Sequence, residues 1–359
     1  MVTEETRMDF NFPKVELHLH LDGAIRFSTL LELSQARGVT LKGARTVEEL
    51  KKVLVTHEPA NLSKVLEAFD LFLPIVRGDE EAIERIAYEM CEDQAANGVI
   101  YFEARYSPHL LCLPGGKLNA TGVVEAVKRG FDRGEKKFNV KARSILCCIR
   151  GLGQYADDVL QIATDYRHLG VVGIDVAGSS GGADEQYESK IVEIFQEAFK
   201  RGIHRTVHVL VKVEQRKKLK RQFFSCAINV MHAERIGHGY RVMQDPEMYK
   251  KYFLDQHRIH LEACPYSSVM TGAVPLDWKN HPIATWAKDK VNFSINRDDP
   301  TCFDNTMTSE LQLVKDEIGA TIHQLWQCQL NAAEASFLTD EEKKPIIEKI
   351  RAAEPSLSD

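Results

Sequence analysis

The chain has 359 residues, of which 44% are hydrophobic and 27% are charged, and these fractions are ordinary for a globular protein. Its formal net charge of −6 and its pI of about 6.1 argue against the class of basic proteins that bind nucleic acid through their overall charge. No uninterrupted apolar run approaches the roughly 18 residues that a membrane-spanning helix needs, so no membrane span is expected.

Eight cysteines are scattered along the chain and form no CxxC pair. This pattern favours reduced thiols in a cytoplasmic protein over a framework of disulfide bonds. The first residues, MVTEETRMDFNFPK, carry acids and have no apolar central region, so a secretory signal is not expected. No sequence feature decides the oligomeric state, and we expect a monomer.

Short apolar runs rich in β-forming residues alternate with longer segments of helical pattern. In chain order, the runs are residues 14–21, 99–106, 142–149, 171–177, 204–210, 234–239, 260–264 and 291–296. Such alternation predicts parallel βαβ units, and eight of them close an α/β fold of the (β/α)₈ TIM-barrel type. No repeat or linker marks a boundary, so residues 1–359 are expected to form one domain. The gap between the first two runs is too long for one crossover, which predicts extra helices over the barrel mouth at about residues 23–98.

Two of the connecting segments have clear helical periodicity. In residues 79–98, Asp79 is the expected N-cap, Gly98 follows the helix, and the apolar positions are Ile83, Ile86, Ala87, Met90 and Ala95. In residues 187–202, the apolar side is expected to comprise Ile191, Ile194, Phe195 and Phe199.

The first run, KVELHLHLD, carries different kinds of side chain on its two faces. Because side chains alternate along a strand, one face holds four apolar residues and the other holds Glu16, His18, His20 and Asp22. In a barrel the apolar face packs on helices, so the polar face points inward, towards the active-site mouth. His18 and His20 could then bind one metal ion, although a half-exposed strand with a hydrated face explains the same pattern.

Other predicted strand ends carry residues of the same chemical kind. His208 ends the fifth run, His238 ends the sixth, and Asp298 and Asp299 follow the eighth. Taken singly, each is more often a structural histidine, a turn or a helix cap, but in a barrel all of them converge on one mouth. Three neutral imidazoles and a carboxylate suit Zn²⁺ or a similar divalent ion with one position open to water. Such an ion lowers the pKa of its bound water to about 7.

Seven segments then suggest a family. They are HLHLDG (18–23), YFEARYSPHLL (101–111), KARSILCC (141–148), IDVAG (174–178), GIHRTVH (202–208), ERIGHGY (234–240) and SINRDDP (294–300). In this order, and over nearly the whole chain, they resemble the animal-type members of the metal-dependent adenosine/AMP deaminase family. The resemblance implies a barrel of the metal-dependent hydrolase (amidohydrolase) type. It also implies hydrolytic deamination of adenosine and 2′-deoxyadenosine to inosine and 2′-deoxyinosine plus ammonia, a step of purine salvage.

The resemblance further implies roles for single residues. The ligands of one zinc ion would be His18, His20, His208 and Asp298, and His238 would orient or deprotonate the water on that ion. Asp299 resembles the carboxylate that hydrogen-bonds purine N7, and Gly178 resembles the backbone group that faces N3. Asp22, with His20, resembles the pair near the ribose 5′-hydroxyl. The catalytic residues would thus be His238 and Asp298, and the partner a small-molecule purine nucleoside. The other family-matching polar residues, expected to give structural support, are Glu103, Arg105, Tyr106 and His109.

One residue that the resemblance requires is missing. In the family, a glutamate three residues after the zinc-binding histidine of the fifth strand protonates purine N1, within a His-Ala-Gly-Glu run. This chain reads His208-Val209-Leu210-Val211, so Val211 stands where the acid belongs. The nearest titratable residues, Lys212 and Glu214, do not have the spacing to replace it. Loss of a general acid lowers a rate by about 10²–10⁴-fold, so the activity of the chain as written is in doubt.

The difference covers a whole block, about residues 209–231, which does not resemble the family although both flanks do. Suppose that the original DNA of this block is read in a shifted frame, in which each codon combines the third base of one present codon with the first two bases of the next. Val209-Leu210, Leu210-Val211 and Val211-Lys212 then permit Ala, Gly and Glu. We hypothesise that the block is a frame-shifted or mis-spliced segment of an otherwise normal enzyme sequence. The coding DNA decides this, because the shifted frame must encode His-Ala-Gly-Glu.

Two alternatives stay open. The chain could be a catalytically inactive paralogue, or a mis-spliced isoform, that binds metal or nucleoside only. The run VEQRKKLKRQFF (213–224) also fits a nuclear-localisation or nucleic-acid patch. However, no aromatic stacking set or second basic stripe accompanies that run.

Overall fold

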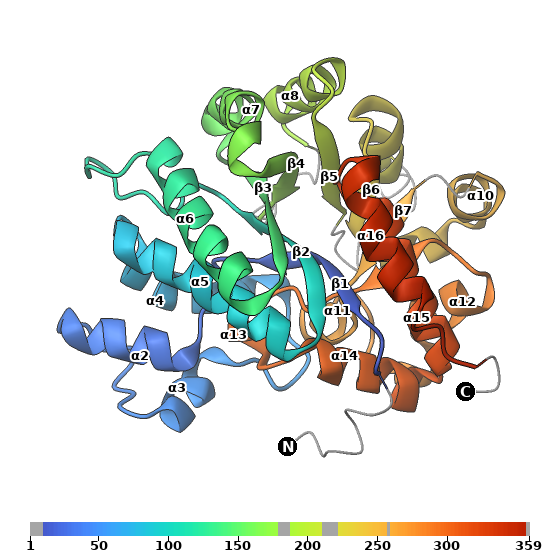
Figure 1. The fold of residues 1–359 in the computed structure, drawn as a ribbon, viewed down its shortest axis with the longest axis horizontal. Helices are drawn as coiled ribbons and strands as arrows, with labels where there is room; N and C mark the ends of the chain where they lie inside the picture. The colour runs from blue at the N-terminus through green and yellow to red at the C-terminus, as the bar shows by residue number, and fades with distance from the viewer. Residues whose placement is uncertain (1–9, 179–186, 210–221, 257–258, 357–359) are drawn as a thin grey trace.

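Eight parallel strands form the centre of the molecule (Figure 1). The computed structural model of the chain describes residues 10–178, 187–209, 222–256 and 259–356. Each strand pairs in parallel with the next one along the chain. The strands are β1 (Lys14–His20), β2 (Val99–Tyr106), β3 (Lys141–Ile149), β4 (Val171–Ala177), β5 (His204–Val209), β6 (Arg235–His238), β7 (His260–Ala263) and β8 (Phe293–Ile295). A parallel bridge between Leu19 and Asp298 joins the chain after β8 to β1 and nearly closes a barrel.

Helices surround these strands, as Figure 1 shows. Between β1 and β2 lie α2 (Phe27–Ala36), α3 (Val47–Leu54), α4 (Leu62–Val76) and α5 (Glu80–Ala96). The later helices are α6 (Ala120–Phe138), α7 (Ala156–Asp165), α8 (Ser189–Lys200), α10 (Pro246–Tyr249), α11 (Pro265–Met270), α12 (Pro282–Lys288), α13 (Pro300–Phe303), α14 (Met307–Leu313), α15 (Ile322–Ala335) and α16 (Asp340–Arg351). The predicted (β/α)₈ barrel with extra helices after its first strand is confirmed.

The predicted elements agree closely with the observed ones. Every predicted strand is present, and its observed bounds lie within two residues of the expected ones. Helix α5 begins as expected, because the Asp79 side chain accepts a hydrogen bond from the Ala82 backbone N–H. One expectation about α8 is wrong: Phe199 is not in the core but 51% exposed. Its ring instead stacks on His232 and lies beside the Arg205 guanidinium.

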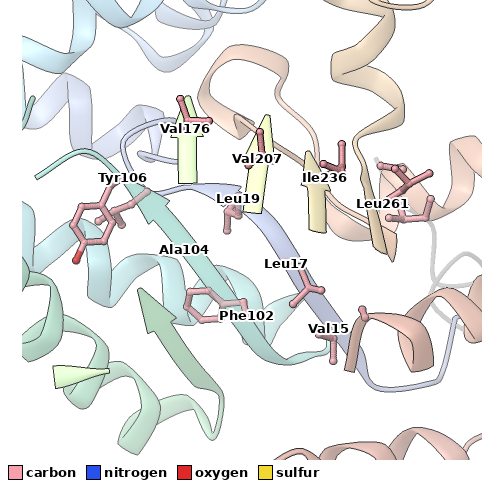
Figure 2. Close-up of a cluster of buried hydrophobic side chains, with 14 of the residues drawn as sticks. Val15, Leu17, Leu19, Phe102, Ala104, Tyr106, Val176, Val207, Ile236 and Leu261 are labelled. Atoms are coloured by element: carbon pink, nitrogen blue, oxygen red, sulfur yellow. The ribbon is translucent and has the colours of Figure 1, made fainter. Parts of the chain in front are cut away.

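Strand β1 separates its side chains as the alternation predicts. Val15, Leu17 and Leu19 are fully buried, and Figure 2 shows them clustered with apolar residues of neighbouring strands. Burial of each such side chain stabilises the fold by roughly 1.5–3 kcal/mol. A slip of one residue would move this whole set to the opposite face. The apolar residues therefore fix the register that turns His18 and His20 inward.

The segment between β1 and β2 reaches the carboxyl ends of the last two strands. The Thr56 backbone N–H donates to the Cys302 carbonyl in α13, after β8, at 2.9 Å. The Ala60 N–H donates to the Met270 carbonyl in α11, after β7, at 2.8 Å. We infer that residues 23–98 supply the extra helices at the barrel mouth. We also infer that the chain is one domain, because one hydrophobic core extends from Phe10 to Ile350.

Two expectations about the environment of the chain can be compared with the structure. Among the described residues, no helix combines the length and the apolar character that a bilayer crossing requires. All eight cysteines lie within the described ranges and all are free thiols, as the scattered pattern predicts.

The block that does not match the family lies partly outside the described residues. That part is 210–221, and it contains Val211, Lys212, Glu214 and most of the basic run. The rest of the block forms a helical turn at 222–225 and a π-helical turn at Cys226–Val230. The buried side chains of these two turns are Phe223, Phe224, Ala227 and Ile228. The second half of the block thus contributes apolar side chains to the core.

A buried carboxyl in α14 makes the stability of this fold depend on pH. Glu310 is 1% exposed and accepts hydrogen bonds from the Tyr266 backbone N–H (3.1 Å) and from Asn305 Nδ2 (2.7 Å). Burial raises its pKa from 4.5 to about 8. Between these values the folded chain keeps a proton that the unfolded chain has released. The contribution of Glu310 to stability therefore falls as the pH rises through this range.

We expect Glu310→Gln to remove that contribution. From about pH 5 to about pH 8, the free energy of unfolding should fall less steeply in the variant, by up to roughly 1.4 kcal/mol per pH unit. Urea unfolding of both proteins across this range measures the difference. Parallel pH dependences would contradict the raised pKa of Glu310.

Candidate active site

Five polar residues from β1, β5, β6 and the segment after β8 meet at the carboxyl end of the barrel. His18 and His20 come from β1, His208 from β5 and His238 from β6, while Asp298 follows β8. Four of them are buried, and His20 is half-buried. His238 and Asp298 have φ angles of 63° and 68°, a left-handed conformation that is uncommon outside glycine and often found at functional sites. The structure therefore gathers these residues as the strand-end argument predicts.

The nitrogen and oxygen atoms of these side chains face one another. Asp298 Oδ1 lies 3.2 Å from His18 Nε2 and 3.3 Å from His20 Nε2. His20 Nε2 also lies 3.3 Å from His208 Nε2. His238 Nε2 approaches the other oxygen, Asp298 Oδ2, at 3.6 Å. Asp298 thus contacts three of the histidines, with one oxygen towards β1 and the other towards β6, and His208 joins the group through His20.

Two buried carboxylates orient the histidine rings. Glu262 Oε2 in β7 lies 2.6 Å from His18 Nδ1, and Asp175 Oδ2 in β4 lies 2.8 Å from His208 Nδ1. When a carboxylate accepts the proton of Nδ1, the lone pair of the ring is on Nε2. Both rings therefore present an Nε2 lone pair to the centre of the site.

Buried arginines compensate the charge of these carboxylates. Arg105 donates through Nη1 to Asp175 Oδ2 (2.8 Å) and through Nη2 to Glu262 Oε2 (2.7 Å). Arg235 pairs with Glu262 Oε1 at 2.8 Å and with Glu103 Oε2 at 2.6 Å. Although burial raises the pKa of Glu262, the two arginines hold that pKa well below its usual range. Glu262 is therefore an ionised acceptor for His18.

Burial and neighbouring charges also set the protonation of the central residues. Burial lowers the pKa of His208 to about 4 and lowers that of His238 well below its ordinary value. Burial raises the pKa of Asp298, but His238 and His18 hold it well below the usual range. Burial lowers the pKa of His20, but Asp299 and Asp298 raise it to about 9. The centre of the site therefore attracts positive charge.

The cluster fits a divalent metal ion. The donor atoms form two overlapping groups, each with all atoms within 4.8 Å of one another, namely His18, His208, His238 and Asp298, and His20, Asp298 and Asp299. His18 Nε2 is buried, has no hydrogen-bond partner in the described part of the chain, and faces the acceptor Asp298 Oδ1. Two buried acceptors at this distance are unfavourable unless a cation joins them. Imidazole and carboxylate are the donors that zinc and similar ions take.

The residues predicted on the substrate side adjoin this cluster. Asp22 Oδ1 and Asp299 Oδ1 are buried atoms without a hydrogen-bond partner among the described residues, so a ligand could use both. Gly23 approaches Asp299 so closely that an added Cβ would lie 1.9 Å from Asp299 Oδ1. Gly178 follows β4 with a φ angle of 86°, and Arg150 links its carbonyl to that of His208.

Sequence reasoning missed several residues that hold the site together. It gave no role to Glu262 or Asp175. An acid within a predicted apolar strand was the signal that could have indicated a role for each. It also missed Ser267, whose hydroxyl donates to Asp298 Oδ2 at 2.6 Å. Asn296 is a further example, because its Oδ1 accepts from the backbone N–H groups of Leu17 and His18. No strand pattern predicts these partners, since they follow from side-chain packing in three dimensions.

The structure places only some of the residues that were expected to support the site in its ionic network. Arg105 and Glu103 belong to the buried ionic network described above. His109 lies apart from the cluster, where its Nε2 is 2.7 Å from Asp158 Oδ2 and its ring stacks on Tyr155. The position of the missing acid, Val211, lies outside the described residues.

Comparison with known proteins identifies the family. A family model described as Adenosine deaminase matches residues 13–353. An adenosine deaminase from Danio rerio is 40% identical over 354 residues, which cover 96% of each chain. The solved structure of Arabidopsis ADAL with IMP has a TM-score of 0.80 at 26% identity, covering 97% of this chain and 99% of that one. An amidohydrolase from Burkholderia ambifaria, solved with bound Zn, shares the fold with a TM-score of 0.82 at 24% identity, covering 98% of this chain and 95% of that one. By sequence and by fold, the chain belongs to the adenosine deaminase family.

Proposed function

We propose that the chain hydrolytically deaminates adenosine and 2′-deoxyadenosine, forming inosine and 2′-deoxyinosine with release of ammonia. The observation that carries this proposal is the convergence of His18, His20, His208 and Asp298 at the barrel mouth. Adenosine deaminases about 40% identical over nearly the whole chain support the same reaction. The relative solved with IMP supports a purine ligand in a site of this fold.

We assign His18, His20, His208 and Asp298 to one divalent ion, which we propose is zinc. A bound ion of this kind supplies activated water at neutral pH. Glu262 and Asp175 support the assignment because they fix which nitrogen of His18 and His208 is free to bind.

The remaining roles are assigned from position and from the family resemblance. His238, whose Nε2 faces Asp298 Oδ2, orients the attacking water or accepts a proton from it. Asp299 binds purine N7, and the Gly178 backbone faces N3. Asp22, with His20, binds the ribose 5′-hydroxyl. The unpartnered Oδ1 atoms of Asp22 and Asp299 support their roles as ligand contacts.

The reaction needs a proton donor that the chain lacks at the expected position. The oxygen of water bonds to C6 and loses both of its protons, N1 keeps one proton and the exocyclic nitrogen takes the other, and the bond between C6 and that nitrogen breaks to release ammonia. With Val211 in place of the acid, we expect turnover about 10²–10⁴-fold slower than with a glutamate.

The alternative is a chain that binds metal or nucleoside without turnover, as an inactive paralogue or a mis-spliced isoform would. The valine at position 211 is compatible with that alternative. The adenosine deaminases to which the chain is similar give it no positive support.

A rate assay separates the two. The purified chain, loaded with zinc, is incubated with adenosine while its ultraviolet absorbance and the ammonia released are followed. We expect slow turnover that disappears in Asp298→Asn, which removes a proposed ligand. Nucleoside binding with turnover no faster than in Asp298→Asn would favour the alternative. Absence of both binding and turnover would contradict the proposal.

We also propose that the protein acts in purine salvage in the cytoplasm, as a monomer. Its partner is then a small-molecule purine nucleoside and not nucleic acid. The free cysteines and the acidic net charge support this assignment.

The close approach of Gly23 to Asp299 leads to a specific prediction. In Gly23→Ala the new Cβ would lie 1.9 Å from Asp299 Oδ1, so this carboxyl has to move. A hydrogen bond to a charged or strongly polar group contributes about 1.5–3 kcal/mol. We therefore expect affinity for a purine nucleoside, measured by calorimetry, to fall about 10–100-fold. Zinc content should remain at the parent level, and unchanged nucleoside affinity would contradict the role of Asp299.

A further inference from the structure

In the described part of the chain, no strand ladder joins the strand ends that carry His208 and Gly178. Among the described residues, β4 and β5 pair only through Gly173 with His204 and Ile174 with Arg205. By contrast, β3 pairs with β4 as far as Ile149 and Ala177. The β4–β5 ladder thus ends at the amino-terminal part of both strands, short of His208 and Gly178. No backbone pairing of the described residues between β4 and β5 therefore fixes the spacing of these two residues directly.

Arg150 spans this gap from the end of β3. Its backbone N–H donates to the Ala177 carbonyl at 3.0 Å, which anchors the residue beside β4. Its guanidinium then divides between the two neighbouring strands, since Nη1 donates to the Gly178 carbonyl at 2.8 Å and Nη2 to the His208 carbonyl at 2.5 Å. The planar fork of an arginine can hold two acceptors at a fixed separation, whereas a lysine ammonium is a single point donor.

A second side chain supports the same carbonyl. Tyr187 Oη donates to the His208 carbonyl at 3.1 Å, and its ring lies 5.4 Å from the Arg150 guanidinium. Tyr187 is 7% exposed, so the contact is shielded from water. Two donors and a cation–π contact therefore hold the backbone of His208.

The side chain of His208 is held independently, by Asp175 at 2.8 Å from Nδ1. Backbone and ring together determine where Nε2 points. His208 also immediately precedes the block, about residues 209–231, that does not match the family. The side chains that anchor it, Arg150, Asp175 and Tyr187, all precede the block in the chain, and its backbone pairs with Gly237 of β6, which follows the block. The anchors of His208 therefore all lie outside the changed block.

We propose that Arg150 is a positioning residue that sets the spacing between His208 and Gly178, and that it preserves metal binding in this chain despite the changed block. The inference rests on the proposed function in taking His208 as a metal ligand and Gly178 as a nucleoside contact. It goes beyond that function by assigning the geometry of the β4–β5 gap to one side chain.

The test is the zinc affinity of Arg150→Lys, measured by competition with a chromophoric chelator, because this readout needs no turnover. The lysine keeps the charge but cannot span both carbonyls. We expect zinc affinity to fall about 10–100-fold, as is typical when a partner of a metal ligand is lost. The visible absorption of the Co²⁺-loaded variant should also differ from that of the parent. Affinity for inosine should fall as well, because the variant no longer holds the Gly178 carbonyl and so no longer fixes the backbone proposed to face the purine.

Arg77→Lys is the matched control. Arg77 is also a half-buried arginine that donates to a main-chain carbonyl, from Nε to Leu110 at 2.7 Å, but it lies outside the site. Its zinc affinity should equal that of the parent. Equal affinities in Arg150→Lys and the parent would overturn the inference while leaving the proposed function intact. A parent chain that binds no zinc would overturn the proposed function itself.

A second variant covers the case in which Arg150→Lys does not fold. Arg150→Gln carries one amide in place of the forked guanidinium, so it cannot donate to the Gly178 and His208 carbonyls as the arginine does. Weaker zinc binding by this variant supports the inference, and zinc binding equal to that of the parent overturns it.

Discussion

Replacing Val209-Leu210-Val211 with Ala-Gly-Glu is expected to raise kcat for adenosine by about 10²–10⁴-fold. The family resemblance places a proton donor for purine N1 three residues after His208, and a valine has no proton to give. The other groups that the reaction needs are brought together in the structure, with His18, His208 and Asp298 facing one another. Steady-state kinetics of the triple variant V209A/L210G/V211E and of the parent measure the gain.

The matched control is V209A/L210G/V211Q. Glutamine has the shape of glutamate and can form a hydrogen bond, but it cannot transfer a proton. We expect it to improve KM at most, with kcat close to that of the parent. An equal gain in kcat from glutamine and glutamate would show that the segment's shape, and not a missing acid, limits the rate. A parent chain as fast as V209A/L210G/V211E would contradict the proposed chemistry.

The second large effect is expected from Glu262→Gln. Glu262 is fully buried and accepts hydrogen bonds from Arg105 Nη2 (2.7 Å) and Thr206 Oγ1 (2.9 Å), in addition to its contacts with His18 and Arg235. The neutral amide of glutamine leaves the positive charges of Arg105 and Arg235, both buried, less compensated. Breaking a buried pair in this way destabilises a protein by about 3–5 kcal/mol. Urea unfolding of the metal-free chain measures this loss.

The same substitution should also weaken metal binding. A glutamine no longer draws the proton of His18 to Nδ1 as strongly, so we expect zinc affinity to fall about 10–100-fold. Glu32→Gln is the control, because it removes an exposed ion-pair partner of Arg85 and should change stability much less. If Glu262→Gln is as stable as Glu32→Gln, the buried ionic network does not contribute to the free energy of unfolding as its geometry implies.

Much of the fold and of the site could be predicted from the sequence because both depend on short periodic patterns. The alternation in KVELHLHL fixes which face of β1 is apolar, and that face alone turns His18 and His20 inward. Residues such as His208, His238 and Asp298 could be located because parallel strands bring their carboxyl ends to one edge. Phe199 shows the limit of the same reasoning, since helical spacing indicates a side of a helix but not where the core ends.

The supporting contacts could not be predicted because they join strands that are distant in sequence. Glu262 holds His18 from β7, and Arg150 holds His208 from the end of β3. No local pattern contains either pair. The departure at Val211 is the opposite case, since only comparison with a family motif shows that an acid is missing there.

Anomalous diffraction from a crystal of the chain as written, recorded at the zinc edge, tests the central claim most directly. We predict a single zinc ion bound by His18 Nε2, His20 Nε2, His208 Nε2 and one oxygen of Asp298, with His238 Nε2 facing the open side of the ion. A zinc ion bound elsewhere, or a zinc-soaked crystal with no ion among these atoms, would contradict the assignment of this cluster as the catalytic centre.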